Sequence, residues 1–494
     1  MPVLPSAGTH EADVAVVGAG AAGLYAALCA ARERASVVLV SATPLAQTAS
    51  YWAQGGLAAA LAANDSFELH LRDTELAGRA LVRRSAAEAL VHEAPERVRD
   101  LQALGVRFDA DRFGHLALGL EGGHSVRRVV HAGGSATGRR VVRQLSALAV
   151  EEPRIAVFEG ARAHALWRAD DRCRGLICDD GRVIAARAVV IATGGAAALW
   201  SRTTNPPGSQ GVGLLLAHAA GAALADLELL QFHPTAVIGV PGREGFLVTE
   251  AIRGEGATLH DSCGERFVDE LAPRDEVSRA IQALLAQSGE RSVGLDMRAI
   301  DPAHFPNVVA SLRDAGLDPT RELIPVAPAA HYMMGGIVSD LHARSTLPGL
   351  YAVGESSCTG LHGANRLASN SLSECFVFAR RAVLDALSHA DPRLPAASDG
   401  ELQRLRELPP PAIATPDTRA ALWRDAGVVR TPDGLASLLD DPHPLARMIA
   451  TCALARTESR GAHLRADHPE RDPAFDYRHG VLAEDHAIAW QTWR

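Results

Sequence analysis

The sequence predicts an α/β fold with a dinucleotide-binding unit near its start, and three observations lead to this prediction. Residues 14–17 are mostly β-branched and typical of a buried strand, and G-x-G-x-x-G at residues 18–23 joins them to an alanine-rich helix. A second apolar run at residues 36–40 is typical of the next parallel strand. A third run, at residues 187–195, ends in Ala-Thr-Gly-Gly, although alone it is equally compatible with an ordinary buried strand and turn.

Each glycine of the first turn has an expected task. Gly18 permits a tight turn, Gly20 lets the backbone approach a pyrophosphate, and Gly23 lets the helix pack closely on the strand. The first N–H groups of the helix, near Ala21 and Ala22, are then free to bind phosphate oxygens. A glycine-rich turn without a ligand is the plainer alternative, but the position between a strand and a helix favours a phosphate site.

The end of the second strand argues against NAD as the dinucleotide. NAD sites usually place a carboxylate there, about 20 residues after the glycine turn, where it binds the ribose hydroxyls. This chain has Ser41 and Thr43 instead, which would bind the ribose more weakly. The sequence therefore favours another dinucleotide, and the motifs that follow indicate FAD.

Length, charge and cysteine content exclude several classes of function. A chain of 494 residues is expected to form two or three domains with large cores. A net charge of −9 and a pI near 6.1 make nucleic acid and anionic membranes poor partners. No apolar run is long enough to span a bilayer and residues 1–13 lack the pattern of a secretion signal, so we expect a cytoplasmic protein. Seven cysteines without a C-x-x-C pair indicate reduced thiols, with no metal or iron–sulfur site.

A glycine pair after the second strand leaves room for a flat ring system. Residues 53–56 read Ala-Gln-Gly-Gly, with small residues such as Ser50 around them. Here the chain resembles the flavoprotein family of succinate dehydrogenases, fumarate reductases and L-aspartate oxidases, whose first flavin loop ends in A-Q-G-G. In the dehydrogenases a histidine five residues before the glutamine carries the flavin covalently, and this chain has Ala49 at that position. The resemblance therefore implies FAD that is bound tightly but non-covalently.

The loop at residues 118–128 separates the activities within this family. It contains Glu121 followed by Gly-Gly-His-Ser and, shortly after, two arginines. From its glycine content alone it is compatible with a solvated surface loop. The loop resembles that of aspartate oxidases, which have E-G-G-H-S at this place, whereas fumarate reductases have an apolar residue before the glycine pair. A substrate α-ammonium group needs a carboxylate and succinate has no such group, so Glu121 favours an amino diacid.

Five further motifs match the family in the same order along the chain. They are Q-F-H-P-T at residues 231–235, T-E-A-I-R-G-E-G at 249–256, A-P-R-D at 272–275, A-A-H-Y at 329–332 and H-G-A-N-R-L-A-S-N-S-L at 362–372. Two departures stand beside these matches. Val212 replaces an aspartate that usually contacts the flavin nucleotide, and Met333 with Met334 replaces Thr-Cys. Because Val212 removes one expected contact, it predicts weaker binding of FAD.

The resemblance implies three domains. A Rossmann-like FAD-binding domain is expected to be discontinuous, at residues 1–228 and 335–391, with an inserted α+β capping domain at residues 229–334. A C-terminal helical domain is expected at residues 392–494. Its short helices are expected at residues 402–408, 420–425, 435–440 and 445–454.

The resemblance also implies a C4-dicarboxylate site beside the flavin. Two carboxylates need two poles of cationic or hydrogen-bond-donating groups, and an arginine binds one carboxylate through two bonds. Arg274 alone would be interpreted as a surface arginine, but the family uses the arginine of A-P-R-D as the acid in fumarate reduction. The expected catalytic and substrate-binding residues are Arg274, Glu121, His233, His331, Arg366, Gln231, Thr249 and Ser369.

Two later segments are expected to complete the FAD site. Glu355 ends a strand and would hydrogen-bond a ribityl hydroxyl, and Asn370 with Ser371 would cap a helix that points at the flavin pyrimidine. The expected cofactor contacts are Gly18, Gly20, Ala21, Ala22, Gly23, Ser41, Ser50, Ala53, Gln54, Gly55, Gly56, Ala163, Thr193, Gly194, Glu355, Asn370, Ser371 and Leu372.

These residues together predict hydride transfer from Cα of L-aspartate to FAD, which gives iminoaspartate, with fumarate or oxygen as electron acceptor. With oxygen the second product is peroxide. The resemblance implies a place at the start of NAD biosynthesis, where iminoaspartate enters quinolinate formation and quinolinate synthase is a pathway partner. One alternative is a soluble fumarate reductase or the flavoprotein subunit of a respiratory complex. Another is a flavin-binding redox sensor without turnover.

Overall fold

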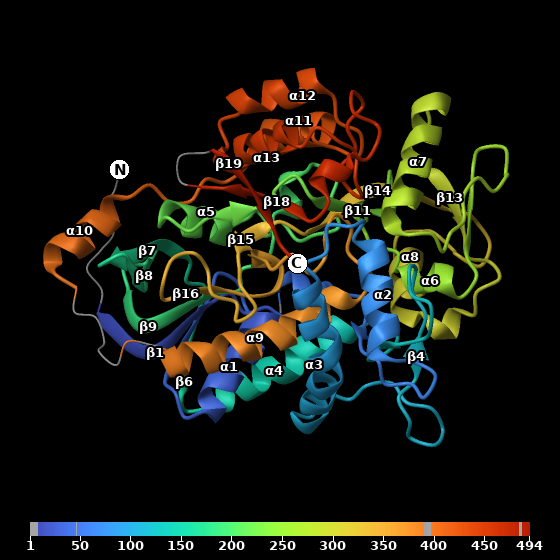
Figure 1. Cartoon of the computed structure of the whole chain (residues 1–494). Helices are drawn as coiled ribbons and strands as arrows, with labels where there is room; N and C mark the ends of the chain where they lie inside the picture. The colour runs from blue at the N-terminus through green and yellow to red at the C-terminus, as the bar shows by residue number, and fades with distance from the viewer. Residues whose placement is uncertain (1–7, 46, 390, 392–396, 484–486) are drawn as a thin grey trace.

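The computed structural model describes residues 8–45, 47–389, 391, 397–483 and 487–494. Residue 392, the expected start of the C-terminal domain, lies outside these ranges. In Figure 1 a large sheet with its helices forms the lower left of the molecule, a smaller sheet with its helices forms the right, and the C-terminal helices lie at the top.

A seven-stranded sheet forms the base of the fold. Its strands are β1 (Thr9–Val17), β2 (Val37–Ser41), β6 (Ile155–Glu159), β7 (Ala163–Ala169), β8 (Arg172–Cys178), β9 (Val183–Ile191) and β16 (Leu350–Ala352). Strands β6, β2, β1 and β9 are parallel, and β16 adds to the C-terminal half of β9 in the same direction. Below the sheet in Figure 1 lie α1 (Ala21–Arg32), α4 (Thr137–Glu151) and α9 (Asn370–His389). The strands have apolar cores on both faces, as expected for a parallel sheet.

The turn between β1 and α1 needs glycine for steric reasons. Gly18 has φ +108°, and a Cβ there would lie 2.3 Å from the carbonyl oxygen of Ala192. A Cβ on Gly23 would lie 1.9 Å from the carbonyl oxygen of Gly18, so the helix can approach the strand only because no side chain is present. The expected tasks of these two glycines are therefore confirmed.

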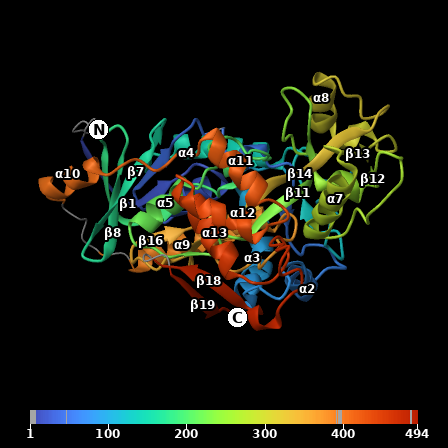
Figure 2. The ribbon, with the colours of Figure 1, turned by 90° about the horizontal axis from the view of Figure 1, so that it is seen from above.

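A four-stranded antiparallel sheet forms a separate unit at the right of Figure 1 and the upper right of Figure 2. Its strands are, in spatial order, β11 (Leu230–Val237), β14 (Ile324–Met333), β13 (Val293–Asp296) and β12 (Thr258–His260). It shares an apolar core with α6 (Glu250–Gly254), α7 (Arg274–Ser288) and α8 (Pro306–Asp314). All these elements fall within residues 229–334, which we call the capping segment; the domain limits themselves stay a prediction.

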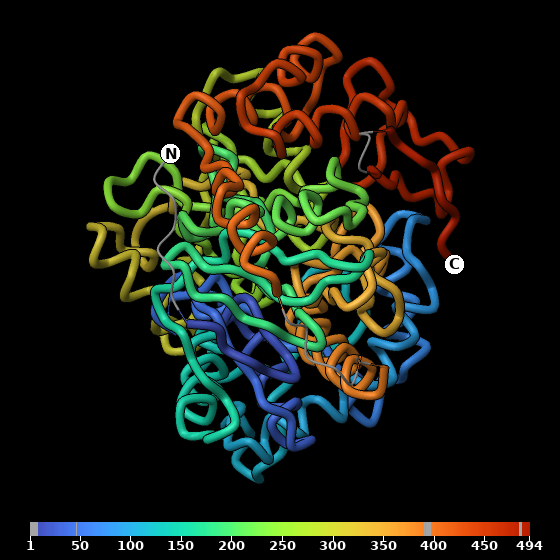
Figure 3. Tube along the Cα trace, turned by 90° about the vertical axis from the view of Figure 1, so that its left-hand side faces the viewer, coloured from blue at the N-terminus to red at the C-terminus, as the bar shows by residue number. Residues whose placement is uncertain are grey.

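The C-terminal region combines the expected short helices with two strands that were not expected. The helices are α10 (Asp399–Glu407), α11 (Pro416–Asp425), α12 (Pro432–Ser437) and α13 (Pro444–Ala455). The strands β18 (Arg478–Leu482) and β19 (Ile488–Thr492) extend a sheet that also contains β17 (Ser357–Cys358), β15 (Gly336–Val338) and β10 (Leu224–Ala225). Figure 3 shows this end of the chain beside the blue N-terminal part, where Ser85 Oγ donates to the carbonyl oxygen of Arg494 at 2.9 Å.

The remaining elements surround the base sheet. They are the strands β3 (Leu57–Ala58), β4 (Leu118–Gly119) and β5 (Val129–Val130), and the helices α2 (Phe67–Ala77), α3 (Arg84–Ala103) and α5 (Val212–Ala219). Helices α2 and α3 are separated by Arg79 and Ala80, two consecutive residues with positive φ, +58° and +57°. Among the described residues, no helix combines the length and hydropathy needed to cross a bilayer.

Candidate active site

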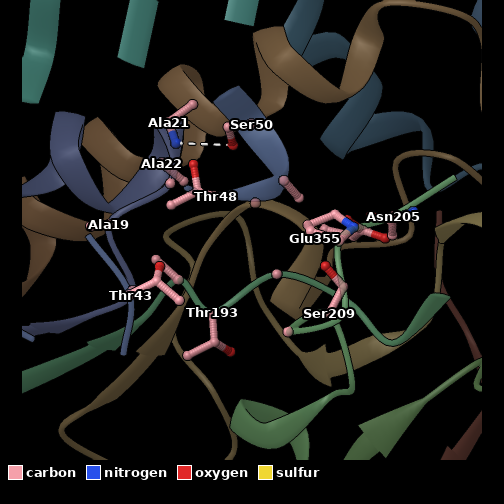
Figure 4. Close-up of a pocket in the computed structure, with 18 of the residues that line it drawn as sticks. Ala19, Ala21, Ala22, Thr43, Thr48, Ser50, Thr193, Asn205, Ser209 and Glu355 are labelled. Atoms are coloured by element: carbon pink, nitrogen blue, oxygen red, sulfur yellow. Dashed lines mark hydrogen bonds between the residues drawn. The ribbon is translucent and has the colours of Figure 1, made fainter. Parts of the chain in front are cut away.

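A cavity of about 860 Å³ lies above the carboxyl ends of the parallel strands and is shown in Figure 4. Its volume is within the range of roughly 300–1,000 Å³ that small-molecule and cofactor sites occupy. The expected cofactor contacts that line it are Gly18, Gly20, Ala21, Ala22, Ser41, Ser50, Ala53, Ala163, Thr193, Gly194, Glu355, Ser371 and Leu372. Those outside its lining are Gly23, Gln54, Gly55, Gly56 and Asn370.

The end of the cavity next to α1 has the features of a phosphate site. Gly20 precedes the helix, and a Cβ there would lie 3.1 Å from the hydroxyl oxygen of Ser50. Ser50 Oγ also accepts a hydrogen bond from the backbone N–H of Ala21 at 3.1 Å, the dashed line in Figure 4. The first turn of α1 and the positive end of its dipole therefore face the cavity, which suits a pyrophosphate.

The other end of the cavity fits a planar ring with polar edges. Arg366, His331 and Tyr332 line it. Gln54 Nε2 donates to the carbonyl oxygen of Leu247, which also lines the cavity, at 2.7 Å. The buried side-chain oxygen of Gln54 has no hydrogen-bond partner among the described residues. Such an oxygen is costly to leave unpaired, and Gln54 directly follows Ala53 of the cavity wall, so the N–H of a flavin ring bound there would be a suitable partner. The residues therefore fit FAD.

Glu355 faces the cavity in Figure 4. Its Oε1 accepts a hydrogen bond from the backbone N–H of Met333 at 2.9 Å. Burial raises the pKa of Glu355 to about 7, against the opposing effects of this hydrogen bond and of the Arg366 charge. A carboxyl group in this state accepts a hydroxyl hydrogen bond when ionised, so the position agrees with the role expected at the ribityl chain.

Asn370 does not present its side chain to the cavity, contrary to the expected cap. Its Oδ1 lies 2.8 Å from His70 Nε2, and its Nδ2 donates to Thr74 Oγ1 at 3.0 Å, so both ends of the amide are bound to α2. Ser371 does line the cavity, and its hydroxyl accepts a hydrogen bond from Arg366 Nη1. Nothing in the sequence indicated that α2 would bind the amide of Asn370, because His70 lies 300 positions away.

Beside the flavin end, five of the predicted residues form one cluster. Arg366 Nη2 lies 3.1 Å from His331 Nε2, and Arg366 Nε donates to Gln231 Oε1 at 3.3 Å. The rings of His331 and His233 make an edge-to-face contact with centroids 5.0 Å apart. Arg274 Nη1 donates to the same oxygen of Gln231 at 3.0 Å. These residues come from β11, β14, α7 and the loop before α9, so the fold brings together the donors that a dicarboxylate needs.

The two histidines of the cluster are neutral. Burial and the charges of Arg274 and Arg366 hold the pKa of His233 well below its usual value, and burial with Arg366 and Arg274 does the same for His331. The backbone N–H of Thr235 donates to His233 Nδ1 at 3.3 Å, which leaves the proton on Nε2. His233 is therefore a hydrogen-bond donor rather than a cation.

Arg274 is paired with a carboxylate that was not among the predicted residues. Its Nε donates to Glu250 Oε2 at 2.6 Å, and Arg253 Nη2 lies 3.0 Å from the other oxygen of Glu250. All three side chains are buried. Glu250 and Arg253 stand three residues apart on α6. Opposite charges at this spacing on a helix pair with each other, so the T-E-A-I-R-G motif could have predicted this ion pair. Thr249, a predicted substrate contact, is buried directly before this helix.

Glu121 is buried, with 2% of its surface exposed, so the surface-loop interpretation is wrong. Ser369 Oγ donates to Glu121 Oε2 at 2.7 Å, and His131 Nε2 lies 3.3 Å from Oε1. A Cβ on Gly55 would lie 3.6 Å from Oε1, which places the acid against the A-Q-G-G loop. Burial acts to raise the pKa of Glu121, but the hydrogen bonds from His131 and Ser369 and the Arg274 charge lower it to about 2. The acid is therefore ionised.

Comparisons with known proteins agree with this architecture. A family model for an FAD binding domain matches residues 13–372, and one for the fumarate reductase flavoprotein C-terminus matches residues 438–491. The L-aspartate oxidase of Caulobacter vibrioides is 45% identical over 493 residues, which cover 94% of this chain and 95% of the relative. The L-aspartate oxidase of Mycobacterium tuberculosis is 43% identical, with 93% of each chain covered. The chain belongs to the L-aspartate oxidase family.

Two solved fumarate reductases share the fold of this L-aspartate oxidase family member. A quinol-fumarate reductase with menaquinol molecules has a TM-score of 0.90 at 30% identity and covers 99% of this chain and 98% of its own. The quinol fumarate reductase of E. coli has a TM-score of 0.87 at 30% identity, with 98% and 97% covered. The predicted fold class and the FAD cofactor are thus confirmed. Ala49 and Val212, the two departures expected to affect the flavin, both lie in the cavity wall.

Proposed function

We propose that this chain oxidises L-aspartate to iminoaspartate with FAD as the bound oxidant. The observation that carries the proposal is the ionised carboxylate of Glu121 beside a cluster of arginines and histidines. A buried negative charge repels a plain dicarboxylate, whereas it pairs with the α-ammonium group of an amino diacid. Glu250 does not have this role, because Arg274 and Arg253 already neutralise it. Membership of the L-aspartate oxidase family supports the same assignment.

The cluster would bind the two carboxylates of the substrate. Arg366 offers a guanidinium group at the cavity wall, and neutral His331 stands next to it. His233 Nε2 and the hydroxyl of Thr249 would serve the second carboxylate. Burying these donors without an anion is costly, so their convergence supports an anionic ligand.

Bound FAD would accept the hydride that leaves Cα of L-aspartate. One proton leaves the substrate ammonium group at the same stage, so the C–N single bond becomes the double bond of a protonated imine. Glu121 would hold the ammonium group and orient Cα. Arg274 and Glu250 would form the proton-handling pair: in fumarate reduction the arginine would give a proton and be recharged through Glu250, and microscopic reversibility gives the pair the opposite task in the reverse reaction. In L-aspartate oxidation we assign the pair the same accepting task, for the proton that leaves the substrate nitrogen.

Fumarate or oxygen would then take the electrons, and with oxygen the product is peroxide. The imine product would serve quinolinate formation, with quinolinate synthase as the pathway partner. These parts of the proposal rest on the family resemblance. A cytoplasmic location is proposed on the same ground.

A soluble fumarate reductase is the second candidate, favoured by the likeness to quinol-fumarate reductases and by the Arg274–Glu250 pair. It predicts that succinate reduces the flavin. A redox sensor without turnover predicts a flavin that no dicarboxylate reduces.

Anaerobic bleaching of the purified holoenzyme separates these candidates. L-Aspartate is expected to remove the yellow flavin absorbance rapidly, whereas D-aspartate and succinate leave it in place. Bleaching by succinate and not by L-aspartate would overturn the proposal in favour of a fumarate reductase, and no bleaching by any of the three would favour the sensor.

A further inference from the structure

Arg128 is the centre of a buried hydrogen-bond network outside the substrate cluster. Its Nε and Nη2 each donate to one oxygen of Asp65, both at 2.9 Å, and the side chains of both residues are fully buried. Its Nη1 donates to Asp73 Oδ2 at 2.5 Å and contacts His124 Nδ1 at 3.1 Å. An arginine carries only donors, so Nδ1 of His124 must accept and its proton lies on Nε2.

The protonated nitrogen of His124 reaches the loop before α9. Nε2 donates to the carbonyl oxygen of Ala368 at 2.9 Å. Burial and the charge of Arg128 lower the pKa of His124, so the ring stays neutral in this tautomer. The next residue, Ser369, has φ +61°, a conformation that costs energy outside glycine and that neighbouring contacts must stabilise.

Two side-chain hydrogen bonds join the turn at residues 121–124 to the loop at residues 366–369. His124 N donates to the carbonyl oxygen of Glu121 at 3.2 Å, so these two residues belong to one tight turn. Glu121 accepts from Ser369 Oγ, and His124 donates to Ala368. Ser369 is also held by the backbone N–H groups of Gly56, which donates to its Oγ at 3.1 Å, and of Ala58, which donates to its carbonyl oxygen at 3.2 Å. Loss of the His124 bond therefore leaves Ser369 in place but removes the contact that fixes the preceding peptide, so Ser369 Oγ can shift relative to the carboxylate of Glu121.

We propose that His124 is a positioning residue that sets the preference for an amino diacid over a plain diacid. It acts through Ala368 and Ser369 on the place of Glu121, and it does not itself reach the substrate. The proposal rests on the proposed function, in which Glu121 binds the α-ammonium group.

Three substitutions of His124 separate its two hydrogen bonds. In His124→Gln the amide nitrogen reaches the place of Nε2 and keeps the donor to Ala368. In His124→Asn the shorter amide reaches only the position of Nδ1, so it keeps the acceptor for Arg128 and loses the donor to Ala368. His124→Leu removes both hydrogen bonds. The matched control is His443→Leu, because His443 is also a buried histidine whose Nε2 lies near a backbone carbonyl, that of Ala412 at 3.3 Å, in the C-terminal region.

The experiment compares two reactions of each holoenzyme: L-aspartate oxidation, and fumarate reduction by a reduced viologen dye. The Asn and Leu variants are expected to raise KM for L-aspartate tenfold or more, with fumarate reduction within threefold of wild type. The Gln variant and His443→Leu should keep both reactions within threefold. Should His124→Leu fail to fold, the comparison of Gln with Asn decides.

Equal losses in both reactions would make His124 merely structural and overturn the inference, as would an Asn variant that behaves like Gln. Failure of the proposed function looks different, because the wild-type flavin itself would then not be reduced by L-aspartate.

Discussion

Arg79 and Asp275 form an ion pair through two hydrogen bonds, in which Arg79 Nε and Nη2 each donate to a different carboxylate oxygen at 3.0 Å. Asp275 directly follows Arg274 at the start of α7, and its side chain is only 1% exposed. Arg79 stands in the left-handed link between α2 and α3. The pair therefore fixes the helix that carries Arg274, in the capping segment, to the link between α2 and α3 outside that segment.

Replacing Arg79 with Met should lower the stability of the holoenzyme by about 3 kcal/mol, because buried Asp275 then keeps, within the described part of the chain, only the more distant ion pair with Arg279. The measurement is the thermal unfolding midpoint. Arg84→Met is the control, since its ion pairs with Glu75 and Glu88 are exposed and should contribute at most about 0.5 kcal/mol. An Arg79 variant as stable as this control would contradict the role given to the pair.

Replacing Glu250 with Gln should lower kcat by about 100-fold while KM changes little, because the change acts on proton transfer rather than on binding. Arg274→Lys should cost at least as much, since an ammonium group cannot contact both Glu250 and Gln231 in the fork geometry of arginine. Steady-state kinetics of both variants, with flavin content as the control, tests this. A pure rise in KM would show that Glu250 acts in binding.

Glu121→Gln should weaken transition-state binding of L-aspartate by about 2–3 kcal/mol, the size of a lost charge-assisted hydrogen bond. Fumarate reduction should not fall and is expected to rise, because fumarate has no ammonium group and Gln removes the charge that repels a plain dicarboxylate. The ratio of kcat/KM in the two reactions measures this difference. Equal loss in both reactions would remove the assignment of Glu121 as the ammonium site.

The kcat/KM for L-aspartate should show no titration of His233 or His331 near the usual histidine pKa of 6.5, over the range from about pH 6 to 8. Burial and the neighbouring arginines lower the pKa values of His233 and His331, so both rings are neutral throughout this range and protonate only at lower pH. Glu121, with a pKa near 2, is ionised over the same range. Stopped-flow bleaching rates across pH test this. A fall in kcat/KM as pH rises through 6.5 would show that a charged histidine is required.

Val212→Asp should tighten FAD binding by roughly fivefold, the effect of one hydrogen bond of about 1 kcal/mol. Residue 212 begins α5 and lies in the cavity wall, so a carboxylate there meets both the helix dipole and the cofactor. Fluorescence titration of the apoprotein gives the affinity.

Acid precipitation of the holoenzyme should release all FAD, because Ala49 provides no group for a covalent bond; flavin retained in the pellet would contradict this.

The parts of the fold that depend on local pattern could be predicted from the sequence. The glycine turn after β1 and the short C-terminal helices are examples, because strand and helix periods and glycine sterics act within a few residues. Strands β18 and β19 could not be predicted, since they form by pairing with β10, far earlier in the chain. Their short, mixed sequences give little signal without that partner.

In the candidate site, too, some features could be predicted from the sequence and others depend on contacts between distant residues. Its arginines and histidines were recognised through family motifs, and the structure brings Arg274, Arg366, His233 and His331 together. The pairing of Glu250 with Arg274 was not recognised, because Glu250 lies 24 positions earlier and only Thr249 of the T-E-A-I-R-G motif was given a chemical role. The side chain of Asn370 was expected at the flavin, and only the contact with α2 shows otherwise.

The pairing of β18 with β10 also has a consequence for synthesis. Leu224 pairs with Leu482, so one edge of β10 stays unpaired until the ribosome has added the residues between them. At about 5–20 residues per second this delay is roughly 10–50 s. During that time the nascent chain exposes an unpaired edge, and a ribosome that stalls before β18 is made would leave this edge exposed permanently, as a substrate for chaperones and proteases.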